Sequence, residues 1–371
     1  MDSAELLEEY TPGDFFFATH ARTVLGSGSR QAFTDTDVVS LSDEVFAALA
    51  EAPESLAVGV LPFDTTATPG HLVLPRRVRV AGATVSAGRK PVAAPVSVRA
   101  VPEPVRHAEA VARAVKILRE RGMRKVVLAR ALDVGFASPV PAQAILNNLV
   151  TDKAGGYTFA AGLPSGRSLI GATPELLLSR FGGHVVSYPH AGSAPRSADP
   201  VSDRENAATL AASRKDRTEH AVLAEAVVET LRPFCRRLDV PAEPSLVSTP
   251  TMWHLGTKIS GELVDRDVTA LRLAAALHPT PAICGSPTDS ARQLVGELEP
   301  FDRGYYAGTV GWMDARGDGE WAVSIRCAEV DTRSLRLYAG GGIVPASDPK
   351  AELDETSAKF QTLLRAMGLE L

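Results

Sequence analysis

The sequence is poor in cysteine, which limits its possible covalent and metal chemistry. Its three cysteines, Cys235, Cys284 and Cys327, lie far apart and none belongs to a Cys-x-x-Cys pair. This spacing argues against a disulfide framework and against a zinc or dithiol redox site. We therefore expect all three thiols to be reduced.

Long apolar runs and an excess of one charge are also missing. No run of about 20 apolar residues occurs, and the acidic segment MDSAELLEEYTPGD lacks the apolar centre of a signal peptide. We therefore expect no membrane span and a cytoplasmic protein. The formal net charge is −5 without a basic run, which argues against a nucleic-acid or membrane-surface partner.

What remains is the composition of an ordinary globular protein. Of the 371 residues, 45% are hydrophobic and 22% are charged. Length alone favours two domains. Residues 1–100 are rich in proline, glycine and short apolar runs, which predicts short strands joined by turns and no catalytic constellation. No coiled coil is evident, and we expect a monomer.

A glycine triplet and a charged helix stand together near the C-terminus. The glycines at 340–342 follow an apolar strand and predict a turn, and Asp348 predicts the start of a helix. On this helix, Glu352, Glu355 and Lys359 fall within one narrow sector. They fit either a solvated face with a Glu355–Lys359 pair or the wall of a binding site.

A second helix, within residues 213–235, carries a glutamate on its apolar side. Glu219 lies inside the stripe formed by Val222, Leu223 and Val227. A carboxylate on a buried face is costly unless it is paired or bound to a cation. Two carboxylates from different helices, with substrate and water oxygens, would suit Mg²⁺. Both interpretations of Glu219 remain open from the pattern alone.

Four further polar residues lie in predicted strands or turns. Lys125 shares a strand face with small apolar residues, Glu175 follows a Thr-Pro turn, His254 lies in mid-strand, and Arg326 interrupts an otherwise apolar strand. Each has an ordinary structural explanation, such as a lysine that extends to solvent or a hydrogen-bonded core histidine. A buried arginine is also suited to clamp a carboxylate.

Taken together, these segments resemble the chorismate-binding enzymes, and most closely the isochorismate synthases. They cover residues 105–366 in the family's order and at about its spacing. No single segment is specific, but the ordered set is. The matching segments are RKVVLAR, IGATPELLLSR, AGSAPR, KDRTEHAVL, WHL, LHPTPAICG, GYYAGTVGW, GEWAVSIRCAEV and AGGGIVPASDPKAELDETSAKF.

The resemblance implies a fold and a domain organisation. It implies an α+β protein with one large domain over residues 1–371, in which two antiparallel sheets pack together with helices outside. Residues 1–100 would supply strands to the shared sheets, and residues 105–366 would carry the motifs. This expectation replaces the two domains that length alone favours.

The resemblance also implies an isomerase. Members of this family bind chorismate with Mg²⁺ and differ in the nucleophile that reaches ring carbon 2. Lys125 stands where water-using members have a lysine, and the loop at 281–285 lacks the lysine of the aminodeoxychorismate enzymes. Water would therefore add at carbon 2 and the carbon-4 hydroxyl would leave, giving isochorismate for a siderophore or menaquinone pathway.

Two other functions remain compatible with the motifs. A salicylate synthase would share the same residues and would continue to pyruvate elimination from bound isochorismate. A catalytically silent binding subunit would share only the fold. Intact Lys125, Glu175, Glu219 and Glu355 argue against the silent subunit.

By resemblance, three residues act on the reacting groups. Lys125 is the general base that activates water, which requires a neutral amine. Glu175 is the general acid for the leaving hydroxyl, which requires a raised pKa. His254 points at the ring and is the residue linked in this family to pyruvate elimination.

The remaining assignments concern the metal and the substrate carboxylates. Glu219 and Glu355 would hold Mg²⁺, and Glu352 would order a water bound to it. Arg326 and Tyr306, with the glycine backbone, would grip the enolpyruvyl carboxylate. The expected substrate-binding residues are Gly192, Ser193, Ala282, Ile283, Tyr306, Arg326, Gly340, Gly341, Gly342 and Lys359.

Overall fold

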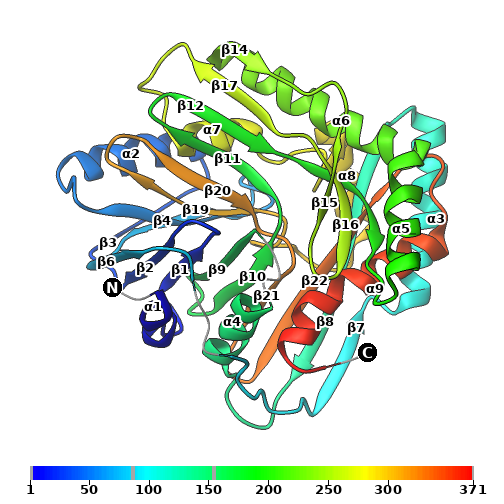
Figure 1. Ribbon diagram of the computed structural model, residues 1–371, viewed down its shortest axis with the longest axis horizontal. Helices are drawn as coiled ribbons and strands as arrows, with labels where there is room; N and C mark the ends of the chain where they lie inside the picture. Colours follow the sequence, from blue (N-terminus) through cyan, green and yellow to red (C-terminus); the bar gives the residue numbers. More distant parts are fainter. Residues whose placement is uncertain (1–2, 85–87, 153–155, 370–371) are drawn as a thin grey trace.

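The computed structural model describes residues 3–84, 88–152 and 156–369. Two large antiparallel sheets with helices around them dominate the fold, which confirms the predicted α+β class (Figure 1). A small third sheet, which the sequence did not predict, lies beside them. Its strands are β13 (His190–Pro195), β16 (Met252–Gly256) and β15 (Ser245–Ser248).

The ten-stranded sheet contains the strands that lead into the C-terminal helix. In spatial order its strands are β18 (Gly285–Ser286), β8 (Lys125–Gly135), β22 (Ser334–Ile343), β21 (Cys327–Val330), β10 (Ser168–Thr173), β9 (Tyr157–Gly162), β1 (Phe15–Ala18), β2 (Thr23–Ser27) and β6 (Arg77–Ala81), and β7 (Ser97–Val101) pairs with β8.

The nine-stranded sheet takes its strands from both halves of the chain. They are β14 (Cys235–Asp239), β17 (Ile259–Leu263), β12 (His184–Tyr188), β11 (Leu176–Phe181), β20 (Gly319–Val323), β19 (Thr309–Asp314), β4 (Leu56–Leu61), β5 (Gly70–Leu74) and β3 (Gln31–Asp35). The first hundred residues thus contribute strands to both large sheets. This sharing favours the single domain, which stays a prediction.

Helices lie around the sheets, and their starts follow local capping rules. Asp348 accepts hydrogen bonds from the backbone N–H groups of Lys350 and Ala351 and begins the C-terminal helix, as predicted. The helices are α1 (Ser3–Glu9), α2 (Val38–Ala50), α3 (Pro104–Arg121), α4 (Ala142–Thr151), α5 (Pro200–Ala212), α6 (Arg214–Leu231), α7 (Ala270–Leu277), α8 (Thr288–Leu298) and α9 (Pro349–Ala366), and a 3₁₀ turn spans Arg232–Phe234. None of the described helices is long and apolar enough to cross a membrane.

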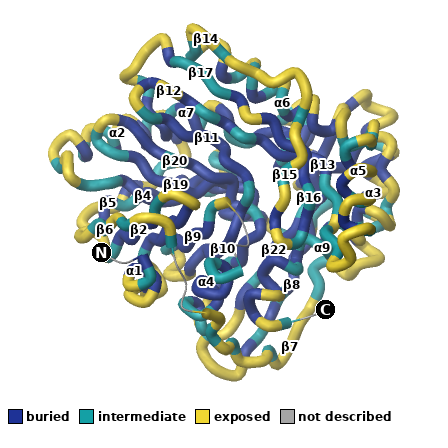
Figure 2. The backbone as a smooth tube through the Cα atoms, viewed as in Figure 1, coloured by how far each residue is buried: buried dark blue, intermediate teal, exposed yellow. Residues whose placement is uncertain are grey.

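Alternation along the strands divides the hydrophobic interior into two cores. Phe15 and Phe17 point to one face of the ten-stranded sheet and cluster with Trp321 of the nine-stranded sheet. Phe16 points to the other face, where it clusters with apolar residues of α1, α4 and α9. The central strands are accordingly buried, and exposed backbone is concentrated in loops and outer helices (Figure 2).

The predicted turn at 340–342 is wrong, because these glycines belong to β22. Gly340 pairs with Ala129 of β8, and Gly342 pairs with Val127. A Cβ atom on Gly342 would lie 2.1 Å from Oε1 of Glu219, so any other residue there would force the Glu219 side chain to move. Glycine is needed here for the close approach of a side chain, not for a turn.

The predicted position of Arg326 within a strand is also wrong. Strand β20 ends at Val323, and β21 begins at Cys327 in the other large sheet. Arg326 lies in the crossing between the two sheets and has a φ of 50°. Positive φ is uncommon outside glycine and often marks a functional position.

Candidate functional site

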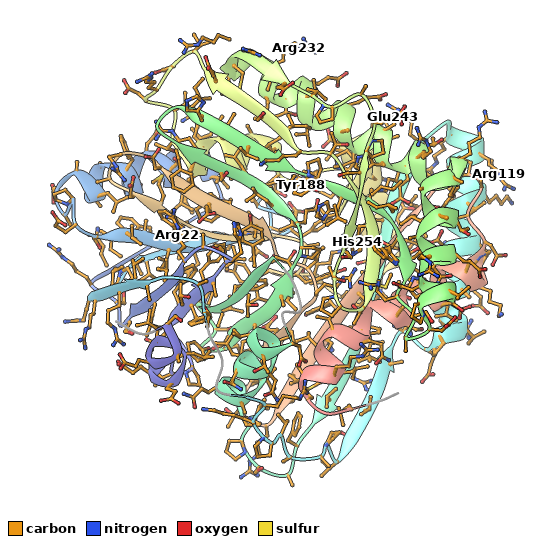
Figure 3. The ribbon with its side chains drawn as sticks, in the orientation of Figure 1. Arg22, Arg119, Tyr188, Arg232, Glu243 and His254 are labelled. Atoms are coloured by element: carbon orange, nitrogen blue, oxygen red, sulfur yellow. The ribbon has the colours of Figure 1, made fainter. Side chains whose placement is uncertain are left out.

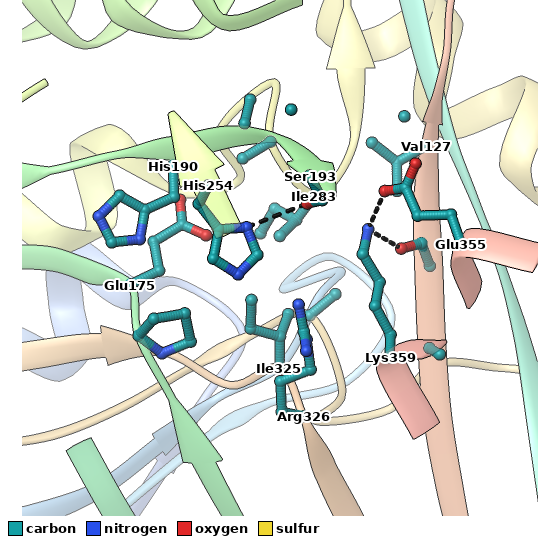
Figure 4. Close-up of a pocket in the computed structure, with 18 of the residues that line it drawn as sticks. Val127, Glu175, His190, Ser193, His254, Ile283, Ile325, Arg326, Glu355 and Lys359 are labelled. Atoms are coloured by element: carbon teal, nitrogen blue, oxygen red, sulfur yellow. Dashed lines mark hydrogen bonds and ion pairs between the residues drawn. The ribbon is translucent and has the colours of Figure 1, made fainter. Parts of the chain in front are cut away.

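A cavity lies among the three sheets and helices α6 and α9, with about 670 Å³ of atom-free space including solvent at its mouth (Figure 4). Figure 3 places His254 in the interior, whereas Arg119, Arg232 and Glu243 lie at the periphery. Most residues assigned from the sequence line this cavity: Glu175, Gly192, Ser193, Glu219, His254, Ala282, Ile283, Tyr306, Arg326, Gly340, Gly342, Glu355 and Lys359.

Three assigned residues lie behind the lining instead of in it. Lys125 is fully buried, and its Nζ lies 2.9 Å from Oε1 of Glu219, which does face the cavity. Gly341 faces away from the cavity because β22 alternates its two faces, and a Cβ there would meet Glu352 at 3.2 Å. Glu352 is itself buried beside Ser347, whose hydroxyl donates to its Oε1 at 2.7 Å.

Glu175 is a buried acid at the cavity wall. It follows Pro174 in the break between β10 and β11, and it is 3% exposed. Burial raises its pKa to about 7, although the backbone N–H of His190 and the charges of Lys125, Lys359 and Arg326 oppose this rise. A substantial fraction of Glu175 therefore holds a proton near neutral pH, as an acid catalyst requires.

His254 and Ser193 meet on the three-stranded sheet. Strands β13 and β16 pair Ser193 with His254, and the Ser193 Oγ lies 3.0 Å from Nδ1 of the imidazole. Burial, followed by the nearby charge of Arg326, lowers the pKa of His254 well below its usual value. The imidazole is therefore neutral, and its Nε2 has no hydrogen-bond partner among the described residues.

Arg326 points into the cavity and is 5% exposed (Figure 4). Burial lowers its pKa to about 10, which leaves the guanidinium charged at neutral pH. Within residues 3–84, 88–152 and 156–369, no carboxylate lies within ion-pair distance of it. A buried charge without a counter-ion is unfavourable, so a ligand anion would stabilise it.

The predicted metal ligands are each neutralised by a lysine. Glu219 pairs with Lys125 at 2.9 Å, and Glu355 pairs with Lys359 at 2.6 Å. Figure 4 shows the second pair, in which the Lys359 ammonium also donates to the Gly340 carbonyl at 2.8 Å. The Glu355–Lys359 ion pair predicted from the sequence thus exists, and both residues line the cavity.

The third lysine, Lys215, was missed by the sequence analysis. Its Nζ lies 3.1 Å from Oε1 of Glu352 and 3.8 Å from Oε2 of Glu219. Burial opposes its charge, but Glu219, Glu352 and Glu355 outweigh burial and raise its pKa. Its position one helical turn before Glu219 was the available signal.

The carboxylates around Lys215 fit a hard divalent cation in their chemistry. One ammonium touches both Glu219 and Glu352, so a single cation can reach both, and Oε2 of Glu352 is buried without a partner among the described residues. Burial, followed by the charge of Glu355, raises the pKa of Glu352. Over the same residues, no group of three or more acidic, histidine or cysteine ligands is arranged around one point.

Several lining residues had no assigned role from the sequence. His190 is buried, and it stacks on His254 with ring centroids 6.0 Å apart. Burial lowers the pKa of His190 to about 3, so this second imidazole is also neutral. Ala307, also in the lining, has a φ of 58°. Its backbone strain is invisible in the sequence.

Comparisons with known proteins place these features in context. The family model described as chorismate binding enzyme matches residues 78–368. The isochorismate synthase DhbC of Bacillus subtilis is 47% identical, over 98% of this chain and 96% of that protein. The vibriobactin-specific isochorismate synthase of Vibrio cholerae is 40% identical, over 98% of this chain and 93% of that protein.

A solved structure shows the same architecture. It is the crystal structure of a Bacillus anthracis protein assigned as a 2,3-dihydroxybenzoate-specific isochorismate synthase, DhbC. The two chains superpose with a TM-score of 0.94 and are 42% identical. The match covers 99% of this chain and all of the other.

Proposed function

This chain belongs to the chorismate-binding enzyme family, on its isochorismate synthase branch, and from this premise we propose that it converts chorismate to isochorismate. Within the structure, the proposal rests on two groups that line the same cavity: the buried guanidinium of Arg326, which has no ion-pair partner among the described residues, and the Glu175 carboxyl, whose pKa burial raises to about 7. Arg326 can bind a substrate carboxylate, and Glu175 can protonate a leaving hydroxyl in the same cavity.

The carboxylates on α6 and α9 would hold the Mg²⁺ on which this family generally depends. Glu219 and Glu355 are the proposed direct ligands, and Glu352 the proposed partner of a coordinated water. When bound, Mg²⁺ would offset a substrate carboxylate charge and help to fix the orientation of the ring.

The chain's own residues then divide the proton transfers of the reaction. Lys125 accepts a proton from the water that attacks carbon 2, and Glu175 gives its proton to the hydroxyl that leaves carbon 4. The Lys125 Nζ lies 2.9 Å from Oε1 of Glu219, which lines the cavity. His254 and Ser193 also line the cavity.

Product analysis tests the proposed reaction. The purified protein is incubated with chorismate and Mg²⁺, and the products are separated. We expect isochorismate without a matching amount of pyruvate. Salicylate and pyruvate in equal amounts would instead identify a salicylate synthase, and unchanged chorismate would identify a silent binding protein.

Substitution of Lys125 by alanine tests the proposed base. We expect turnover to fall by at least about 100-fold, because general base catalysis contributes factors of that order. Mg²⁺-dependent chorismate binding should remain, since Arg326 and the proposed metal ligands are retained. Unaltered turnover would remove the base assignment.

The related enzymes also favour a destination for the product. One is vibriobactin-specific and another is assigned as 2,3-dihydroxybenzoate-specific, so we propose a siderophore-type pathway instead of menaquinone synthesis. Deletion of the gene should abolish 2,3-dihydroxybenzoate production under iron limitation and leave menaquinone levels unchanged. Loss of menaquinone would contradict this assignment.

We also propose that the enzyme is monomeric and cytoplasmic, as its composition and family favour. The described thiols of Cys235, Cys284 and Cys327 are all unpaired. Sedimentation velocity at micromolar concentration should show a single species with the mass of one chain. A stable dimer would contradict the proposed state.

A further inference from the structure

A buried ion pair lies directly behind one wall of the cavity and contributes no atom to its lining. Arg303 and Glu299 are 2% and 3% exposed by side chain and lie four residues apart, after the end of α8. The Arg303 Nε donates to Oε2 of Glu299 at 2.8 Å, and its Nη2 donates to Oε1. Such a bidentate pair holds its geometry firmly.

This pair fills a gap in the hydrogen-bond ladder of β8. On one edge of β8, strand β18 pairs only with Lys125 and Val126, and β7 begins pairing at Ala131. In the gap, Nη2 of Arg303 donates to the Val127 carbonyl at 2.8 Å. The Ala129 N–H donates to Oε1 of Glu299 at 2.7 Å, so the ion pair takes the place of a neighbouring strand.

The same guanidinium also fixes a second wall of the cavity. Its Nη1 donates to the Ile283 carbonyl at 2.7 Å, and Ile283 lines the cavity. The guanidinium carbon lies 4.3 Å from the centroid of the Phe63 ring, which restricts its movement. One planar group therefore joins β8, which carries Lys125, to the loop that carries Ile283.

We propose that Arg303, held by Glu299, is a positioning residue for the reaction. Its guanidinium sets the spacing between β8 and the 282–283 loop, and so the place of the Lys125 amine relative to the bound ring. This inference rests on the proposed function. Because a displacement of about 1 Å can cost a 100-fold loss of rate, the pair affects chemistry more than binding.

A second buried ion pair offers a matched control. Arg180 on β11 and Asp318 in the β19–β20 turn are 4% and 9% exposed by side chain. Arg180 also donates to the Arg316 carbonyl at 2.9 Å, so it too ties a charged pair to backbone. None of these residues lines the cavity. Disruption of the Arg180–Asp318 pair therefore measures the stability cost of breaking a buried ion pair, without the positioning effect proposed for Arg303.

The test compares Arg303→Lys with Arg180→Lys in the full-length protein with Mg²⁺. Lysine keeps the charge but loses the planar fork that reaches several acceptors. Thermal unfolding is measured first, and kinetics follow well below both midpoints. Both variants should lose stability. Only Arg303→Lys should lose about tenfold or more in kcat, with KM changed by less than about threefold.

Glu299→Gln provides a second variant if Arg303→Lys does not fold. The amide oxygen can still accept from Ala129, but the ion pair with Arg303 is lost. Like Arg303→Lys, Glu299→Gln should lower kcat, whereas its matched control Asp318→Asn should not. An equal kcat in the Arg303 and Arg180 variants would overturn the inference. So would failure of both cavity-side variants to fold while both controls fold.

The outcomes separate this inference from the proposed function. If the unaltered protein forms no isochorismate, the proposed function fails and no comparison of variants is needed. If the unaltered protein is active and Arg303→Lys matches it in kcat, only the positioning role fails. A rise in KM alone, with kcat intact, would assign Arg303 to binding and would also overturn it.

Discussion

At the scale of single residues, Glu175 and Glu219 are both buried, but their pKa values shift in opposite directions: burial opposes the charge of each, and the contacts with Lys125 and Lys215 outweigh it only at Glu219. The Glu175 pKa of about 7 lies above the usual 4.5, because burial disfavours the carboxylate. The stability gained from the protonated form in the folded state is therefore full below about pH 4.5. It is lost as the pH rises through about 7.

This loss of stability with rising pH predicts how Glu175→Gln should behave. The amide cannot ionise, so the variant should gain stability over the unaltered protein as the pH rises from 5 to 8.5, by on the order of 3 kcal/mol. Urea unfolding at several pH values measures the difference. The exposed Glu44→Gln variant is the control and should show no such trend. A pH-independent difference for Glu175→Gln would contradict the raised pKa.

Lys215 shows which part of the site depends on contacts between segments that are distant in the sequence. The apolar stripe of its helix indicated that Glu219 lies on a buried face, where a carboxylate is costly unless it is paired or bound to a cation, and Glu219 is 6% exposed. The stripe says nothing about Glu352, which lies more than a hundred residues further on. Only the folded chain brings that carboxylate to 3.1 Å from Lys215. The helical spacing of Lys215 and Glu219 could therefore indicate their proximity, but the contact of Lys215 with Glu352 could not be predicted from the sequence.

Substitution of Lys215 by methionine tests its relation to the metal. Removal of an ammonium that contacts Glu352 and Glu219 should tighten Mg²⁺ binding to the substrate-free protein by about tenfold, because Mg²⁺ no longer competes with it. Isothermal titration calorimetry measures the affinity. Lys116→Met, on the exposed face of α3, is the control. Weaker Mg²⁺ binding by Lys215→Met would show that the lysine supports the metal site.

At the scale of elements, β22 explains why glycine content alone was misleading. Three consecutive glycines after an apolar strand are typical of a turn, yet here the strand continues through them to Ile343. Side chains from other elements occupy the space beside each one, including the Tyr306 hydroxyl, 2.8 Å from a Cβ placed on Gly340. Such crowding depends on tertiary contacts and cannot be predicted from local sequence.

Gly342→Ala tests this crowding. Its Cβ would lie 2.1 Å from Oε1 of Glu219 and 2.7 Å from Cε of Lys125, so the ion pair must move. We expect a stability loss of about 1–3 kcal/mol and a weaker Mg²⁺ affinity. Gly341→Ala, whose Cβ meets the flexible end of Glu352 at 3.2 Å, should be milder. Equal effects in the two variants would contradict the assignment of faces along β22.

At the scale of the whole molecule, the motif order predicted the two large sheets, but not the small third sheet. That sheet pairs β13 with β16, which brings Ser193 beside His254. The crossing at Arg326 was missed for a related reason, since apolar residues continue on both sides while the chain changes sheets. Pairing between distant strands is a tertiary property.

Because the cavity lining comes from two of the sheets and from a loop that leads directly into the third, ligand binding should stabilise the whole fold. Val127 belongs to the ten-stranded sheet, Ser193 to the three-stranded sheet, and Glu175 directly precedes β11 of the nine-stranded sheet. Each proposed metal ligand already contacts a lysine, so Mg²⁺ alone must displace an ammonium. Chorismate is a dianion, so one carboxylate can offset the charge of Mg²⁺ and the other can pair with Arg326.

We therefore expect Mg²⁺ alone to stabilise the protein only slightly, and Mg²⁺ with chorismate to stabilise it strongly. At a ligand concentration of 100 times its Kd, the gain should be about 2.7 kcal/mol. Thermal unfolding with each ligand alone and with both measures it. Arg326→Met should lose the part that depends on chorismate, because the buried guanidinium is its proposed partner. Equal stabilisation by Mg²⁺ with and without chorismate would show that metal and substrate bind independently.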